Sequence, residues 1–186
     1  MQNEIDIIRD ISEKFSRAGI QFMLTGSVAM NYYAQPRMTR DIDVVIDINT
    51  ETAAAIIALF AEDYYVDAEA IKSAIAHESL FNLIHQETVI KVDCIVRKKS
   101  EYRRFEFDRR SQVTIQDFPT WIVSKEDLII SKLYWAKDSH SEVQLRDVRN
   151  LLQTGYDAEY ITRWTRELGL YELLKECLDE RHITGN

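Results

Sequence analysis

The run Asp41-Ile42-Asp43-Val44-Val45-Ile46-Asp47 constrains the fold more than any other part of the sequence. Apolar and acidic residues alternate strictly over its first half, and successive side chains of a β-strand point to opposite faces. Valine and isoleucine are also the residues that fit best on a pleated, half-buried surface. The run therefore predicts a β-strand, and Asp41 and Asp43 lie on the same face of it.

The Cα atoms of Asp41 and Asp43 are expected to lie about 6.6 to 7 Å apart. Aspartate is depleted in strands, and two neighbouring carboxylates repel each other. A cation between them removes the repulsion, and Mg²⁺ takes one or two carboxylates and completes its shell with water and substrate phosphate. The pattern is equally typical of an acidic strand start on a solvated face beside Arg40.

A second element, Gly26-Ser27, follows the strand-like run Ile20 to Leu24 and opens a helical segment that Pro36 would end. Glycine allows the backbone to approach a ligand closely, and a helix N-terminus presents unpaired N–H groups to a phosphate. Taken alone, the pair also fits an ordinary turn from a strand into a helix.

A third element is Asp93, in the strand-like run 89–96. Val92 and Cys94 share the face expected to be core, so Asp93 lies on the opposite face together with Lys91. Alone, Asp93 would be a solvated strand residue. Beside the two aspartates of the first strand it supplies a third carboxylate.

The sequence resembles the signature of the nucleotidyltransferase superfamily of the DNA polymerase β type in three places: Leu24-Thr25-Gly26-Ser27, Asp41-Ile42-Asp43-Val44 and Val92-Asp93-Cys94. The run Arg37-Met38-Thr39-Arg40 is similar to the bacterial branch that includes AbiEii/AbiGii-type toxins. The C-terminal part resembles that branch as well, in 124–129, 131–133 and 145–148. Asn150 departs from it, because some relatives of the toxin type carry a second Asp there.

The resemblance implies an α/β (α+β) nucleotidyltransferase fold, with a small mixed β-sheet flanked by helices and a C-terminal helical bundle. It implies a metal-dependent enzyme that moves a nucleoside monophosphate from a nucleoside triphosphate to an acceptor hydroxyl. The implied catalytic residues, which would also hold two Mg²⁺ or Mn²⁺ ions, are Asp41, Asp43 and Asp93. The implied nucleotide-binding residues are Gly26, Ser27, Lys132 and Asp147. A toxin of this branch would also have an antitoxin as partner.

The pattern becomes helical from Ser124 to the end, starting with the capping-box-like Ser124-Lys125-Glu126-Asp127. We therefore expect a nucleotidyltransferase α/β core over 1–123 and a helical region over 124–186 packed on it. Further short strands are expected at 80–85, 112–115 and 121–123, and a short helix at 68–76.

Lys132 shares one helical flank with Leu128 and Trp135. A lysine in that apolar company either extends its stem over the core and its ammonium to water, or reaches a phosphate. The resemblance favours the phosphate contact. Asp147 could hold Lys132 or Arg146 in place, or lie on the surface of a charged helix.

The segment 97–110 is basic, with seven Lys and Arg against three Asp and Glu, and aromatic residues are interleaved with the arginines. Such a mixture suits a nucleic acid, and Arg103 and Arg104 are the candidate acceptor-binding residues for an RNA end. The alternative is an ion-paired β-edge. A protein acceptor, or a small molecule of the antibiotic kind, also stays open, as does a catalytically lapsed nucleotide-binding or interaction protein.

Composition narrows the class of protein. The 186 residues suit about one domain, and the net charge of −8 excludes a uniformly basic nucleic-acid-binding surface. No apolar run approaches the roughly 18 to 20 residues that span a bilayer. The two cysteines are too few for a disulfide scaffold. We expect a cytoplasmic protein, with its four histidines at polar surfaces or turns.

Overall fold

The computed structural model describes residues 3–34 and 41–183, with side chains up to residue 179. The chain divides into two compact units: the described residues of 1–28 and 38–123 form one, and those of 29–37 and 124–186 form the other. The boundary that we expected at residue 123 would place 29–37 in the first unit, whereas the described residues of that range belong to the second. Within the described residues, no helix is long and apolar enough to cross a membrane.

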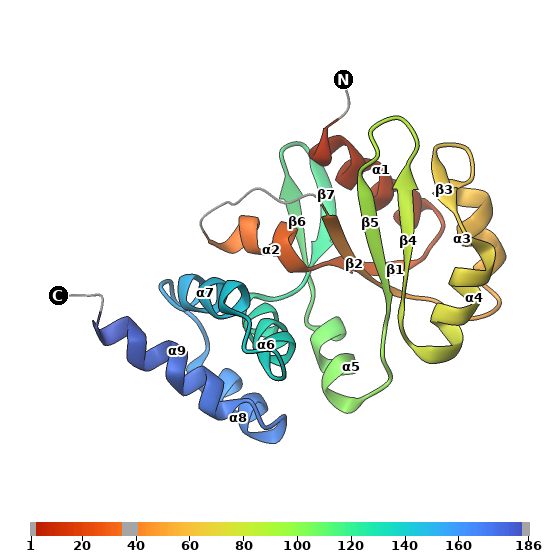
Figure 1. Cartoon of the computed structure of the whole chain (residues 1–186). Coiled ribbons are helices and arrows are strands. Elements are labelled where there is room, and N and C mark those ends of the chain that lie inside the picture. The colour runs from red at the N-terminus through yellow and green to blue at the C-terminus, as the bar shows by residue number, and fades with distance from the viewer. Residues whose placement is uncertain (1–2, 35–40, 184–186) are drawn as a thin grey trace. The chain divides into compact units, whose positions relative to one another are not determined.

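The described residues of the first unit build a seven-stranded mixed sheet in the order β3-β4-β5-β2-β1-β7-β6 (Figure 1). Two strand pairs are parallel, β2 with β5 and β1 with β7, and the other neighbours run antiparallel. The strands are β1 (Gln21–Leu24), β2 (Asp41–Asp47), β3 (Tyr64–Val66), β4 (Leu80–His85), β5 (Lys91–Val96), β6 (Ser111–Ile115) and β7 (Phe118–Ile122).

One face of this sheet is the core of the unit. The alternation along β2 buries Ile42, Val44 and Ile46 completely. On the same face Phe22 of β1 contacts Phe15 of α1 (Glu4–Arg17), with ring centroids 5.4 Å apart, and Phe15 in turn contacts Phe60 of α3 (Ala53–Phe60) at 5.2 Å. The acidic residues of β2 therefore lie on the other face.

The remaining helices of this unit are α4 (Ala68–His77) and α5 (Glu101–Asp108), and α2 (Gly26–Tyr33) begins in it. The expected helix at 68–76 and the strands at 41–47 and 80–85 are confirmed, while the strand expected over 89–96 begins only at Lys91. The two short strands near the end of the unit extend over 111–115 and 118–122. The interpretation of 97–110 as a β-edge is wrong, because 101–108 form α5.

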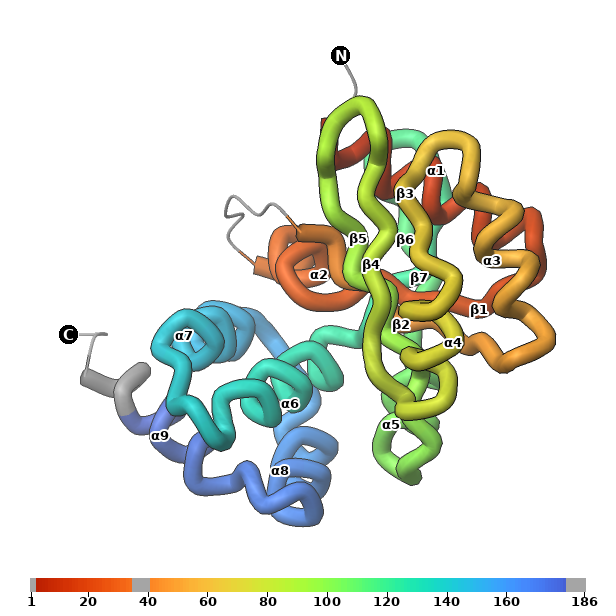
Figure 2. Tube along the Cα trace, turned by 45° about the vertical axis from the view of Figure 1, so that its right-hand side comes forward, coloured from red at the N-terminus to blue at the C-terminus, as the bar shows by residue number. Residues whose placement is uncertain are grey.

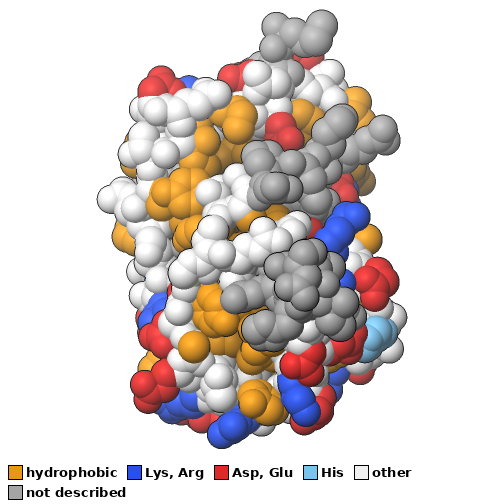
Figure 3. All heavy atoms as spheres, turned by 90° about the vertical axis from the view of Figure 1, so that its left-hand side faces the viewer, with side chains coloured by type: hydrophobic (Ala, Val, Ile, Leu, Met, Phe, Trp, Pro, Cys, Tyr) orange, Lys and Arg blue, Asp and Glu red, His pale blue; other side chains and the backbone are white. Residues whose placement is uncertain are grey.

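The second unit is helical, as expected, with α6 (Lys125–Ala136), α7 (Glu142–Leu151), α8 (Ala158–Glu167) and α9 (Tyr171–Ile183) following one another through short connections (Figure 2). Ser124 caps α6: its hydroxyl accepts a hydrogen bond from the Asp127 N–H at 3.1 Å. The flank with Leu128, Ile129 and Leu133 is buried, whereas Tyr134 and Trp135 are about half exposed. Hydrophobic side chains reach the surface among charged ones on the face seen in Figure 3.

Candidate active site

The parallel pairing of β2 with β5 brings the three acidic residues together. Its register places Asp43 directly opposite Asp93 and Asp41 opposite Lys91. Neighbouring strands lie about 4.8 Å apart, so the side chains of a register pair on one face are neighbours. All four residues point away from the Phe15–Phe22 core. The structure thus assembles on one sheet face what the sequence spreads over more than 50 residues.

Gly26 completes this arrangement from the turn between β1 and α2. The Thr25 N–H donates to the Asp43 carbonyl oxygen at 2.9 Å, and Gly26 has a left-handed φ of +57°. A Cβ atom added to Gly26 would lie 2.0 Å from Asp43 Oδ2 and 2.7 Å from its Cγ. Only glycine allows the backbone to come this close to the carboxylate.

Ser27, the first residue after Gly26, is buried, and its hydroxyl lies 3.4 Å from the Asp41 carbonyl oxygen, to which it donates. Five sequence-predicted site residues therefore gather in the first unit: Gly26, Ser27, Asp41, Asp43 and Asp93. Residues 35–40, which include the toxin-like run Arg37 to Arg40, lie outside the described residues.

Lys91 lies between two of the carboxylates. Its Nζ is 3.1 Å from Asp93 Oδ2, to which it donates a hydrogen bond, and 3.5 Å from Asp41 Oδ1. The hydrogen bond to Asp93 is the main cause that raises the pKa of Lys91, so its ammonium is charged at neutral pH. Lys91 lies beside Asp93 in the sequence, but it is not among the predicted site residues. Its position two residues before Asp93 on the same strand face was the available signal.

One carboxylate oxygen of this group is placed to meet a cation. Asp93 Oδ1 is buried and has no hydrogen-bond partner, although its side chain accepts from Lys91 through Oδ2. An orphaned carboxylate oxygen costs free energy unless a cation or a proton meets it, and Mg²⁺ prefers such hard oxygen ligands. Within the described residues, no three acidic, histidine or cysteine side chains converge as a metal-binding group. The Lys91 ammonium lies between Asp41 and Asp93 and is a cation that these two carboxylates contact.

Lys132 and Asp147 meet in the second unit, where they join α6 to α7. The Lys132 Nζ donates to Asp147 Oδ2 at 2.8 Å and to Gln144 Oε1 at 3.3 Å. Both side chains are buried, at 5% and 1% exposure. The hypothesis that Asp147 holds Lys132 is confirmed. The alternative in which Lys132 extends its ammonium to water is wrong, because the side chain is buried and its ammonium is paired with Asp147.

Arginines of the basic segment 97–110 contact acceptor groups within the same segment. Arg103 donates to both carboxylate oxygens of Glu106 at 2.8 Å, and Glu106 is buried. Arg104 Nε donates to the Lys99 carbonyl oxygen at 2.9 Å. Of the aromatic rings in α5, Tyr102 and Phe107 are buried, while Phe105 is 46% exposed. These contacts favour the ion-paired interpretation of the segment over a nucleic-acid surface, although on a helix and not a strand edge.

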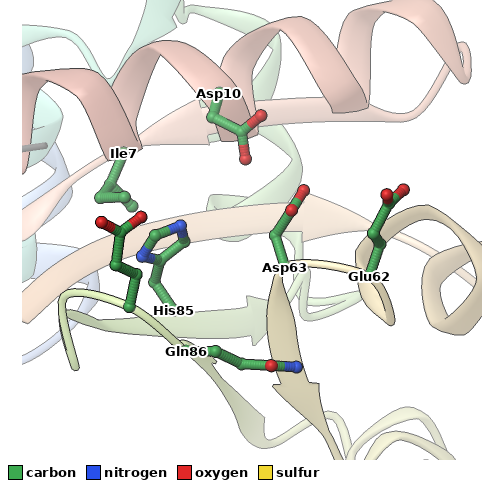
Figure 4. Close-up of a pocket in the computed structure, with 7 residues that line it drawn as sticks. Ile7, Asp10, Glu62, Asp63, His85 and Gln86 are labelled. Carbon is green, nitrogen blue, oxygen red and sulfur yellow. The ribbon is translucent and has the colours of Figure 1, made fainter.

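A cavity of about 230 Å³ lies on the core side of the sheet, apart from the carboxylates (Figure 4). Asp10 of α1 and Asp63, which precedes β3, point into it, and Lys14 bridges them at 3.0 and 2.7 Å. His85 also lines it and is buried against the Tyr64 ring. The expectation of a surface histidine is therefore wrong for His85, since an imidazole flanked by a ring is stabilised in the interior.

Three solved structures resemble this chain. An antigenic nucleotidyltransferase-like protein from Paracoccidioides brasiliensis has a TM-score of 0.66 and 16% identity, covering 96% of this chain and 88% of that one. The antibiotic-resistance factor ANT(2'')-Ia has a TM-score of 0.59 and 13% identity, covering 96% of both chains. The lincosamide antibiotic adenylyltransferase LnuA, with lincomycin bound, has a TM-score of 0.53 and 17% identity, covering 80% of this chain and 96% of that one.

No protein-family model matches the chain, and no curated protein sequence does. At these identities a structural likeness shows the fold alone, because one fold hosts many functions. The likeness to AbiEii/AbiGii-type toxins therefore stays a prediction. The expected mixed α/β architecture is confirmed, and the chain has the nucleotidyltransferase fold.

Proposed function

We propose that this protein is a nucleotidyltransferase, which moves a nucleoside monophosphate from a nucleoside triphosphate to an acceptor hydroxyl. The observation that carries the proposal is the β2–β5 register: Asp43 lies opposite Asp93, with Asp41 on the same face. The close approach of Gly26 to Asp43 supports it further. An ordinary solvated strand has no need of a glycine at that point.

The acceptor oxygen bonds to the α-phosphorus, the bond from that phosphorus to the bridging oxygen breaks, and pyrophosphate leaves with the electron pair. Asp93 takes or orients the proton of the acceptor hydroxyl. Asp41, Asp43 and Asp93 would hold Mg²⁺ or Mn²⁺. Two such ions stabilise negative charge on the attacking and leaving oxygens when bound.

The backbone at Gly26 and Ser27 would meet the β- and γ-phosphates, since N–H groups at a helix N-terminus favour anions. Lys132 would add positive charge to this nucleotide site, with Asp147 as the residue that orients it. That part of the proposal requires the Lys132 ammonium to bind phosphate while it stays paired with Asp147.

The acceptor is either an RNA end or protein, as the basic segment 97–110 suggests, or a small molecule. The local ion pairs of Arg103 and Glu106 leave less basic surface for RNA than the sequence suggests. Two proteins of the same fold have been solved with small molecules bound, LnuA with lincomycin and ANT(2'')-Ia with adenylyl-2''-tobramycin. A small cationic acceptor is therefore the second candidate, and the net charge of −8 suits it.

We place the reaction in the cytoplasm, where triphosphates are abundant. Cys94 and Cys177 are both buried thiols outside any disulfide, as is usual in a reducing compartment. As a toxin, the protein would be held inactive by an antitoxin partner.

The test is a screen of the four labelled triphosphates with Mg²⁺ against total RNA, protein and aminated small molecules. The double variant Asp41→Asn/Asp43→Asn should lose transfer by at least about a thousandfold, because the charges that hold the ions are gone. Asp47→Asn is the matched control, since Asp47 lies on the same strand face but pairs with Arg97 at 2.9 Å. It should keep full transfer.

Two outcomes would contradict the proposal that this protein is an enzyme. Calorimetry could detect triphosphate binding without any transfer, which would indicate the lapsed interaction protein. It could also detect binding that the double variant leaves unchanged, which would place the nucleotide elsewhere. For an RNA acceptor, affinity should fall with salt by a slope of about −0.7 per neutralised phosphate, and Arg104→Ala should flatten that slope.

A further inference from the structure

We infer that Lys91 selects the metal–triphosphate complex over the bare metal ion, by acting as a resident cation among the carboxylates. This inference rests on the proposed function and adds a specificity-determining residue to it. Lys91 is the register partner of Asp41 and bridges Asp41 and Asp93. An ammonium in that position occupies carboxylate oxygens that a divalent ion would otherwise bind.

The surroundings of Lys91 allow it to leave as well as to bridge. Its side chain is 36% exposed, and that of Asp41 is 51% exposed, so the ammonium can move toward water without breaking the core. Asp93 is more buried, at 17% exposure, and only its Oδ2 is engaged by Lys91. The buried Oδ1 has no partner, which leaves one ligand oxygen for an incoming ion while Lys91 is still in place.

The charges give the selection its direction. Asp41, Asp43 and Asp93 carry a formal −3, which Lys91 reduces to −2. A bare divalent ion of charge +2 is therefore attracted less strongly than it would be without Lys91. A triphosphate of charge −4 that carries one such ion has a net charge of −2, and Lys91 attracts it. One residue thus lowers affinity for the bare ion and raises affinity for the complex.

The experiment compares wild type with Lys91→Met in two calorimetric titrations: Mn²⁺ alone, and Mn²⁺ with a non-hydrolysable triphosphate. Removal of the ammonium should tighten binding of bare Mn²⁺ by about tenfold and weaken binding of the complex several-fold. Lys91→Arg, which keeps the charge, should behave like wild type in both titrations. A thermal melt of each metal-free variant checks that it is folded.

Lys72→Met is the matched control, since Lys72 forms an exposed pair with Glu69 at 2.8 Å on α4. It should change neither titration. Weaker binding in both titrations of Lys91→Met would assign Lys91 a merely structural role and overturn the inference, as would no change in either. If wild type binds the complex but Lys91→Met shows no opposite shifts, only the inference fails. If wild type binds neither species, the proposed function fails first.

Discussion

At the scale of single residues, contact with Gly26 limits where the Asp43 carboxylate can lie. The Asp43 side chain fills the volume that any other residue at position 26 would need for its Cβ. Gly26 also has a φ of +57°, a conformation that side chains with a Cβ adopt only with strain. Two physical causes therefore demand glycine, and they can be separated by experiment.

Gly26→Ala should lower the free energy of unfolding by at least about 2 kcal/mol, because it adds a clash to backbone strain. Gly19→Ala is the control for strain alone, since Gly19 has a φ of +68° but nothing within 4 Å of its Cβ position, and it should cost about 1 kcal/mol. Gly155→Ala, with open space and an ordinary φ, should be neutral within about 0.5 kcal/mol.

Urea unfolding of the three variants gives these values, and Mn²⁺ titration shows whether Asp43 has moved. Gly26→Ala should lose Mn²⁺ affinity while the other two keep it. Equal destabilisation of Gly26→Ala and Gly19→Ala would mean that Asp43 simply rotates away, and would remove the argument from close approach.

At the scale of elements, the ion pair of Lys132 and Asp147 links α6 to α7 inside the helical unit. Lys132→Met should cost about 3 to 5 kcal/mol of stability, because it removes the ammonium that pairs with the buried Asp147 carboxylate. The double variant Lys132→Met/Asp147→Leu should recover most of that loss. Removing an exposed pair through Lys72→Met should cost at most about 1 kcal/mol.

The double variant also tests the nucleotide role of Lys132, because it lacks the ammonium and is expected to keep most of the stability of the wild type. Loss of triphosphate affinity in the double variant would support a phosphate contact. Unchanged affinity would make Lys132 and Asp147 structural residues only, and would remove both from the nucleotide site.

The elements that sequence analysis predicted well are those set by local rules. The alternation in 41–47 and the cap at Ser124 need only neighbours within a few residues, and both are confirmed. The partner of β2 could not be derived this way, because parallel pairing of Asp43 with Asp93 depends on the crossover between them. The mixed composition of 97–110 led to the wrong prediction of a β-edge. Its Arg and Glu residues favour a helix, and the contact between Arg103 and Glu106, three residues apart, is one that a helix allows.

At the scale of the whole molecule, each compact unit carries one buried thiol: Cys94 on β5 and Cys177 on α9. β5 lies between β4 and β2 in the sheet, so Cys94 can be exposed only by breaking strand pairs on either side. Cys177 packs on α7, where its Sγ lies 3.9 Å from the Leu145 carbonyl oxygen. A helix that is held by side-chain packing can detach at lower free energy than a central strand that is hydrogen-bonded on both edges.

A thiol-reactive dye should therefore label Cys177 at least about tenfold faster than Cys94 in sub-denaturing urea at pH 8, measured in the single-cysteine variants Cys94→Ala and Cys177→Ala. Equal rates would mean that both units open in one cooperative step.

Burial raises the pKa of the Cys94 thiol, so the thiol stays neutral in the folded state, whereas the unfolded thiol ionises near its ordinary value of about 8.5. Ionisation thus favours the unfolded state. The stability advantage of wild type over Cys94→Ala should be full below that pH and shrink steadily above it, and an advantage that grows with pH would show that Cys94 is not buried as a thiol.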